Sequence, residues 1–191
     1  MKTILTNIII VFLCCNLSMD AFSKNECKYW EDFTEKEKQE VLSSDISKIV
    51  KDFYNKTLEI TDNDKLLVLL DSLDELNHTC EKNALHLYLF TSLCQRSDAA
   101  VSEVLGNYCQ NIILSNPDYV INYLNSNTAL KRNCVQYLGS ELYFKERNTS
   151  KIKYNYKQFK EILIKKLGTD KNNLKLNQLF AELEEAMHRM E

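Results

Sequence analysis

The chain of 191 residues contains only three glycines and one proline. The tight turns of β-sandwiches, β-barrels and doubly wound sheets mostly require glycine, proline or Asn-Gly pairs. Because this chain has so few of these residues, we predict an all-α fold. Its glycines, Gly106, Gly139 and Gly168, also stand alone, so the sequence contains no glycine-rich phosphate-binding loop.

The overall composition narrows the class of protein further. Hydrophobic residues make up 45% of the chain and charged residues 27%, which indicates a folded globular protein rather than a disordered chain or one that crosses a membrane several times. The formal net charge is −3. Proteins that bind nucleic acids are usually basic over the whole chain, so we expect no nucleic-acid partner.

The N-terminal residues 1–23 have the pattern of a secretory signal peptide. Lys2 supplies a positive start, residues 4–19 are mostly apolar, and Ala21-Phe22-Ser23 places small residues at the positions before a cleavage site. The alternative is a retained N-terminal anchor. We predict cleavage near Ser23, export to a periplasm or to the outside, and membrane contact only through this leader or a weak surface interaction. Residues 24–191 are then expected to form a single helical domain.

The rest of the chain predicts about eight helices. Thr34 and Glu37 form a capping box that opens the first helix, whose apolar residues continue to Tyr54. The later helices are expected to begin near Asp62, Asn83, Ser97, Asn116, Thr128, Tyr156 and Asn172. Their short connections favour antiparallel hairpins in an irregular bundle or a short α-solenoid. Residues 152–156 alternate as a strand would, and we interpret them as extended chain leading into a helix.

Two mid-helix glycines admit two interpretations. Val104-Leu105-Gly106 and Tyr137-Leu138-Gly139 share Leu-Gly at an offset of 33 residues, a length typical of helical repeats. The interpretation that we favour is that each glycine lets a neighbouring helix approach closely. With its paired helices and small residues at the crossing, segment 84–124 resembles short HEAT-like α-solenoid proteins. That resemblance covers about a quarter of the chain and implies a binding scaffold rather than a particular activity.

Removal of the leader leaves five cysteines, namely Cys27, Cys80, Cys94, Cys109 and Cys134. An oxidising compartment favours their pairing, and the disulfide candidates are Cys27, Cys80, Cys109 and Cys134. If the third and fourth helices form an antiparallel hairpin, Cys94 and Cys109 are offset by roughly 13 Å along it, too far for a bridge. We therefore predict that Cys94–Cys109 is not a disulfide and that Cys80 is bridged, with Cys109 or Cys27 as its partner.

The motifs of common metal and catalytic sites are missing from the sequence. It contains no His-Glu-x-x-His, no Cys-x-x-Cys, no calcium-binding loop and no Gly-x-Ser-x-Gly. We accordingly predict no metal, no cofactor and no catalytic residue. His86 lies on the most apolar predicted helix and is interpreted as a core histidine. The carboxylates within 71–75 and 182–185 are interpreted as solvated helix faces.

Positive charge is concentrated in one stretch of the sequence, residues 145–171, which we call the basic segment. It holds nine basic residues against three acidic ones, a net charge of +6, with aromatic residues between them. Basic and aromatic residues together suit an acidic protein surface or an anionic headgroup layer. The candidate binding residues are Lys153, Tyr154, Tyr156, Lys157 and Lys160. The alternative interpretation is a solvated helix face and loop.

These patterns together predict an exported, non-enzymatic helical protein that binds another protein. In the simplest case that partner has an acidic surface. A periplasmic inhibitor or immunity-type protein is one concrete version. The competing class is a small secreted hydrolase whose site forms only in three dimensions. A deep pocket lined by His86 or paired carboxylates would favour the hydrolase, whereas a shallow apolar patch rimmed by lysines would favour the binding protein.

Overall fold

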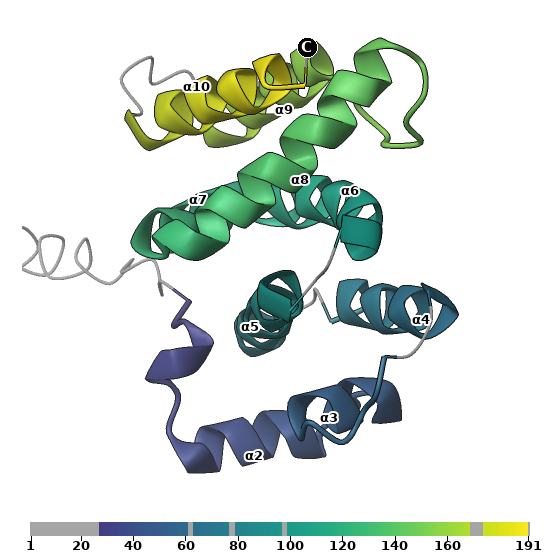
Figure 1. Ribbon diagram of the computed structural model, residues 1–191. Coiled ribbons are helices and arrows are strands. Elements are labelled where there is room, and N and C mark those ends of the chain that lie inside the picture. Colours follow the sequence, from purple (N-terminus) through teal and green to yellow (C-terminus); the bar gives the residue numbers. More distant parts are fainter. Residues whose placement is uncertain (1–26, 61–62, 77–78, 97–98, 169–173, 191) are drawn as a thin grey trace, which may run out of the picture.

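The computed structural model describes residues 27–60, 63–76, 79–96, 99–168 and 174–190, and across these ranges the chain is helical with no strand (Figure 1). A short 3-10 helix, η1 (Trp30–Asp32), comes first. The α-helices are α2 (Glu35–Ser43), α3 (Lys48–Tyr54), α4 (Asn63–Asp74), α5 (Cys80–Arg96), α6 (Ala99–Ser115), α7 (Pro117–Ser126), α8 (Thr128–Glu146), α9 (Tyr156–Leu167) and α10 (Leu174–His188). The prediction of an all-α fold is confirmed.

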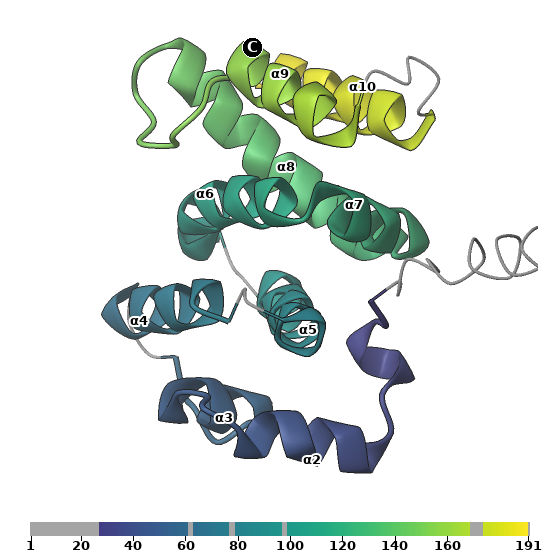
Figure 2. The same cartoon turned by 180° about the vertical axis from the view of Figure 1, so that it is seen from behind.

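The helices lie in layers that follow the order of the chain. Helices α2 and α3 form one end of the molecule, α4 and α5 lie next to them, and α6 and α7 come after (Figure 1). Helix α8 runs diagonally from the α6–α7 layer to the opposite end, where α9 and α10 pack together (Figure 2). The basic segment therefore lies at the end of the molecule opposite to α2 and α3.

The first predicted helix is two helices in the structure. We expected one helix from Thr34 through Tyr54, but α2 ends at Ser43 and α3 begins at Lys48. The Ser44 hydroxyl donates to the Val41 carbonyl at 2.5 Å, and Ser44 leaves the helical conformation. Serine side chains compete in this way for backbone groups that a continuing helix would use. The predicted capping box of Thr34 and Glu37 is present.

Helix α5 lies at the centre of the molecule, as its apolar sequence predicts. Its residues Ala84, Leu85 and Phe90 are almost completely buried. The helix begins at Cys80 rather than at Asn83. Neighbouring layers cover it on both sides in Figure 1, which is the environment of a helix that is apolar nearly all the way round.

Two glycines bring α8 close to the helices on either side of it. A Cβ built on Gly106 of α6 would stand 2.7 Å from the backbone oxygen of Tyr137 on α8, and it would also meet Glu141. A Cβ built on Gly139 of α8 would stand 2.6 Å from the Cβ of Ala186 on α10. Neither helix pair could pack at this distance with a larger side chain. The close-approach interpretation of the two glycines is thus confirmed.

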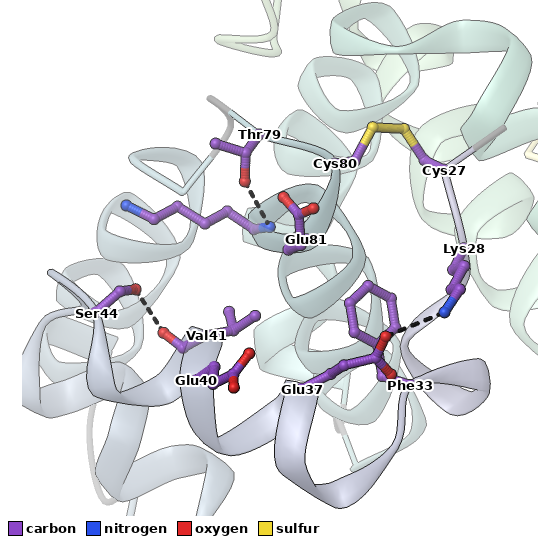
Figure 3. A pocket seen from close by; sticks show the side chains of 11 residues that line it. Cys27, Lys28, Phe33, Glu37, Glu40, Val41, Ser44, Thr79, Cys80 and Glu81 are labelled. Carbon is purple, nitrogen blue, oxygen red and sulfur yellow. Dashed lines mark hydrogen bonds and ion pairs between the residues drawn. A yellow bond between two sulfur atoms is a disulfide. The ribbon is translucent and has the colours of Figure 1, made fainter. Parts of the chain in front are cut away.

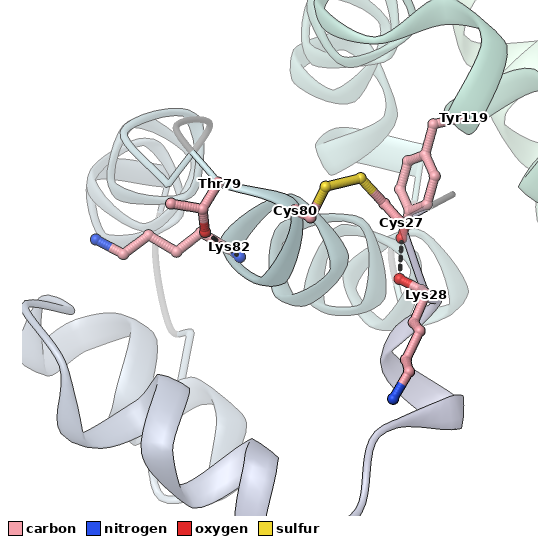
Figure 4. Close-up of a disulfide and its surroundings, with 6 residues drawn as sticks. All are labelled: Cys27, Lys28, Thr79, Cys80, Lys82 and Tyr119. Carbon is pink, nitrogen blue, oxygen red and sulfur yellow. Dashed lines mark hydrogen bonds between the residues drawn. A yellow bond between two sulfur atoms is a disulfide. The ribbon is translucent and has the colours of Figure 1, made fainter. Parts of the chain in front are cut away.

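The N-terminal segment is tied to the body of the protein by one disulfide and two tyrosines. Cys27 and Cys80 form the disulfide, with their Cα atoms 5.3 Å apart (Figure 4). The Tyr119 hydroxyl donates to the Lys28 carbonyl oxygen at 2.9 Å, and the Tyr123 hydroxyl donates to Glu31 at 2.7 Å. Of the two partners predicted for Cys80, the structure therefore shows Cys27.

The other three cysteines, Cys94, Cys109 and Cys134, are buried and form no disulfide within the described residues. Two of the disulfide candidates, Cys109 and Cys134, are thus unbridged here, and Cys94–Cys109 is not a disulfide either. The hairpin geometry behind that last prediction was wrong, however. Helices α5 and α6 cross steeply instead of lying side by side (Figure 1), and the crossing brings the thiols of Cys94 and Cys109 within hydrogen-bonding reach.

In the part of the chain that the structure describes, no helix is both long enough and apolar enough to cross a membrane. The predicted leader, residues 1–23, and its cleavage position lie outside the described residues.

Candidate binding surface

The described part of the basic segment, residues 145–168, includes the end of α8, an extended connection and α9. It contains eight basic residues and two acidic ones, which again gives a net charge of +6. Lys171 and Asp170 lie outside the described residues. The connection carries no strand, so the prediction that residues 152–156 are extended chain leading into a helix is confirmed.

A buried glutamine holds the connection in place. Gln110 of α6 is completely buried, and its Nε2 donates to the carbonyl oxygen of Tyr154 at 2.9 Å. Its Oε1 accepts from the backbone N–H of Tyr154 at 3.0 Å. Ile152, two residues earlier, is buried in the core. A single side chain thus satisfies both backbone groups of Tyr154, as a neighbouring β-strand would.

Both ends of the connection are closed by local caps. At the end of α8, Asn148 has a φ of +57°, a conformation that asparagine tolerates better than most residues. At the start of α9, the Asn155 side chain accepts from the Gln158 N–H at 2.9 Å, and the Gln158 side chain accepts from the Asn155 N–H at 3.1 Å. The connection is therefore a fixed part of the surface.

Two of the five candidate binding residues are already engaged within the fold. The Tyr156 hydroxyl donates to Glu184 of α10 at 2.6 Å, and Lys160 forms an ion pair with the same carboxylate at 3.4 Å. Burial, followed by the bond to Glu184, raises the pKa of Tyr156, and the bond from Tyr156 lowers the pKa of Glu184. The Lys160 ammonium also lies 4.9 Å from the centroid of the Phe180 ring. Tyr156 and Lys160 join α9 to α10.

The candidates Lys153 and Lys157 are exposed, as are Lys151 and Lys165. Among the described residues, none of these four lysines has a carboxylate within ion-pair distance. The Lys153 ammonium lies 5.0 Å from the centroid of the half-buried Tyr154 ring. Since the Tyr154 backbone is fixed by Gln110, this lysine and ring form a preorganised feature. We call Lys151, Lys153, Tyr154 and Lys157 the lysine face.

An aromatic and arginine pair at the end of α8 was not predicted from the sequence. The Arg147 guanidinium lies 3.5 Å from the centroid of the Tyr143 ring, and the neighbouring Phe144 is exposed. Arginine and aromatic residues often dominate interface energies. A phenylalanine beside Lys145 in the last turn of an amphipathic helix is the sequence signal that points to this pair.

The groups that a hydrolase would use are partly brought together. His86 of α5 lies with its Nε2 atom 3.7 Å from Oδ1 of Asp74 on α4, and nearby the Tyr108 hydroxyl donates to Asp71 at 2.5 Å. Burial lowers the pKa of His86 to about 4 and raises the pKa of Asp74 to about 6. His86 is only 2% exposed and packs edge-on against Phe90. This geometry is that of a core histidine, as the sequence indicates.

Two of the three carboxylates of α10 join it to other helices. Glu182 forms an ion pair at 2.7 Å with Lys131 of α8, a lysine that is itself buried. Glu185 pairs at 3.6 Å with Arg189, which directly follows α10, and Glu184 is the partner of Lys160. All three charges are therefore balanced by neighbouring cations within the fold.

An open hollow of about 670 Å³ lies between α2 and the start of α5, beside the Cys27–Cys80 disulfide (Figure 3). Phe33 and Val41 contribute apolar surface to its lining, and three glutamates and two lysines contribute charge. One of these, Glu37, accepts from the backbone and hydroxyl of Thr34 and pairs with Lys28, and these contacts lower its pKa to about 2. Of the three glutamates, Glu37 pairs with Lys28 and Glu40 with Lys36, and the Lys82 ammonium donates to the Asp45 carbonyl oxygen at 3.4 Å.

No group of three or more potential ligands is arranged to hold a metal ion within the described ranges. Comparisons of the chain with protein-family models, with curated proteins and with solved structures gave no match. The resemblance of segment 84–124 to HEAT-like α-solenoids therefore stays a prediction, and the candidate surface rests on its geometry alone.

Proposed function

We propose that the protein is an exported, non-enzymatic helical binding protein and that the lysine face binds an acidic surface of another protein. The observation that carries the proposal is a set of exposed lysines that have no carboxylate partner among the described residues. They lie on and directly after a connection whose backbone is fixed by Gln110. A fixed surface loses little conformational entropy on binding.

The charge distribution supports an acidic partner. The described basic segment carries a net charge of +6 although the whole chain carries −3, so the remainder of the molecule is strongly acidic. Such a polarised molecule is steered so that its basic end meets an acidic partner first. An inhibitor or immunity-type protein that covers an enzyme or a toxin would use a surface of this kind.

The test begins with a pull-down from the exported fraction, followed by binding kinetics on the captured partner. Reversing Lys151, Lys153 and Lys157 to Glu should lower the association rate constant by about tenfold or more at low salt and flatten its salt dependence. Lys160 is left unchanged because its reversal would break the ion pair with Glu184. An unchanged rate and salt slope would remove the lysine face from the interface.

A matched control comes from the opposite end of the molecule. Lys36 on α2 and Lys56, two residues after α3, are exposed, and both helices lie at the opposite end of the stack of layers from α9 (Figure 2). Lys36 forms an exposed ion pair with Glu40 of its own helix at 3.8 Å, so its reversal breaks no contact between helices. Measured at physiological salt, reversal of these two lysines should leave the association rate within about twofold of the wild type, because screening there confines a charge's influence to ~8 Å. An equal effect in both variants would indicate general charge steering instead of a local contact.

The competing hydrolase would depend on His86 and Asp74, a histidine and a carboxylate whose side chains lie 3.7 Å apart. A His86→Gln variant would then lose catalytic turnover on whatever substrate the protein has. We favour the binding protein because the His86 side chain is shielded from any substrate by burial.

A further inference from the structure

Three buried thiols meet where α5, α6 and α8 come together. Cys109 of α6 is completely buried, Cys94 of α5 is 1% exposed and Cys134 of α8 is 2% exposed. The Cys109 thiol is within hydrogen-bonding reach of both of the others. Cys109 is thus the member of the trio placed to form a bridge with either neighbour.

The packing of α6 on α8 distinguishes the two neighbours. Gly106 and Cys109 are three residues apart and therefore lie on one face of α6. Gly106 faces Tyr137 on α8, and Cys109 contacts Cys134, three residues before Tyr137. A step forward along α6 is a step backward along α8, so the two helices are antiparallel and Cys109 lies opposite Cys134.

The glycine at this crossing also sets the spacing that a disulfide needs. Packed helix axes are typically about 8–10 Å apart and each Cα atom lies about 2.3 Å from its axis, so facing Cα atoms approach to ~3.4–5.4 Å, a range that overlaps the lower part of the disulfide range. Disulfides span Cα distances of ~4.4–6.8 Å. The nearest atoms that a Cβ on Gly106 or Gly139 would meet lie on α8 or α10 and not on α5, and the Cys94 backbone oxygen accepts from the Asn133 side chain at 3.3 Å.

We propose that Cys109 and Cys134 form a second disulfide in an oxidising compartment and that Cys94 stays a buried thiol. The oxidant is a low-molecular-weight disulfide or a dithiol oxidase. The thiolate of one cysteine attacks the oxidant's disulfide, forms a mixed disulfide and releases one thiol. The second thiolate then displaces the other, so that two protein thiols are oxidised and the oxidant's disulfide is reduced to two thiols.

Burial dictates when the bridge forms and how it behaves afterwards. An oxidant cannot reach thiols that are at most 2% exposed, so the bridge forms while the chain folds. Once formed, it is protected from reductants for the same reason. Cys27 and Cys80 are only half-buried and line the open hollow. A mild reductant should therefore open Cys27–Cys80 first.

The experiment is to refold the reduced chain without its predicted leader, residues 24–191, which holds five of the seven cysteines, in a mixture of reduced and oxidised glutathione. Remaining thiols are alkylated in denaturant, and the bridges are mapped by non-reducing peptide mass spectrometry. We expect Cys27–Cys80 and Cys109–Cys134, with Cys94 as the alkylated residue. A product with three alkylated thiols, or with Cys94 in a bridge, would overturn the proposal. This mapping of the wild-type chain requires no substitution.

Matched variants test the same assignment independently. Cys94→Ala should keep both bridges and leave no thiol to alkylate. Cys134→Ala should keep only Cys27–Cys80 and leave two thiols, provided that circular dichroism shows the wild-type helix content. Treatment of the refolded wild type with a mild reductant under native conditions should then open Cys27–Cys80 at least about tenfold faster than Cys109–Cys134. Equal rates would contradict a buried second bridge.

Discussion

Gly139 of α8 lies so close to Ala186 of α10 that a Cβ built on the glycine would stand 2.6 Å from the alanine Cβ. Replacing a mid-helix glycine by alanine ordinarily stabilises a helix by roughly 0.5–1 kcal/mol. Here overpacking should dominate, and we expect Gly139→Ala to lower the free energy of unfolding by about 1–3 kcal/mol. Chemical denaturation measures the change.

A double-mutant cycle separates overpacking from other effects. Ala186→Gly removes the atom that the new methyl group would meet, so Gly139→Ala should cost less in that background. Gly106→Ala cannot be relieved in the same way because its Cβ would stand 2.7 Å from the backbone oxygen of Tyr137. If Gly139→Ala proves stabilising by itself, α8 and α10 do not approach as described.

The two hydrogen bonds between the Gln110 side chain and the Tyr154 backbone, which we call the Gln110 clasp, should be sensitive to substitution. Gln110→Leu leaves the backbone N–H and C=O of Tyr154 without the partners that hold them at 3.0 Å and 2.9 Å. Because unsatisfied buried groups cost about 1–3 kcal/mol each, we expect a loss of about 2–4 kcal/mol. The connection should also loosen, and native-state trypsin should cleave faster after Lys151 and Lys153. Gln158→Leu, which breaks only a surface cap, serves as the control. Equal tryptic cleavage in both variants would argue against the clasp.

The Cys27–Cys80 disulfide should contribute stability by restricting the unfolded chain. It joins residues separated by 53 positions, and a loop of that size predicts roughly 4 kcal/mol at most. We expect Cys27→Ala with Cys80→Ala to lower the unfolding free energy by about 2–4 kcal/mol. The N-terminal segment should stay docked, because the Tyr119 and Tyr123 hydroxyls still hold it. Trp30 fluorescence reports the docking, and a red shift in the folded double variant would contradict it.

The pH dependence of stability should reflect two opposing groups. Burial lowers the pKa of His86 from 6.5 to about 4, so between these values the unfolded state binds the proton and acidification destabilises the fold by up to about 3 kcal/mol. The pKa of Asp74 is raised from 3.8 to about 6, so the folded state binds its proton and the same acidification is stabilising. The wild type should therefore depend only weakly on pH between 4 and 6.5.

Removing one of the two groups should expose the other. Asp74→Asn should lose stability as the pH falls from 6.5 to 4, and His86→Gln should gain stability over that range. The measured quantity is the slope of the unfolding free energy against pH. A slope for Asp74→Asn equal to that of the wild type would contradict the opposing assignment.

Local signals in the sequence were sufficient for most of the helices, and long-range pairing explains what they missed. The break between α2 and α3 was not predicted because the apolar residues Val41, Ile46 and Ile49 continue across it. The Ser44 side chain makes this break by donating to the Val41 carbonyl. The Gln110 clasp joins positions 44 residues apart, and the sequence around either residue contains no local pattern that predicts these hydrogen bonds.

For the candidate binding residues, the sequence predicts the local excess of lysines but not which of these lysines are exposed. The concentration of lysines is visible in the sequence, but the division between Lys157, which is exposed, and Lys160, which pairs with Glu184, depends on where α10 lies. The steep crossing of α5 and α6 was equally hidden, because helix lengths and loop lengths do not determine a crossing angle when several ridges can interdigitate.

The glycine contacts on both sides of α8 also determine how the protein opens. Helix α8 cannot separate from α6 or from α10 without giving up a backbone approach that no side-chain motion can replace. Its amide hydrogens should consequently exchange with solvent only through a joint opening of α6, α8 and α10. The surface layer of α2 and α3 shares no such contact and should exchange first, so the molecule behaves as two cooperative units of unequal free energy.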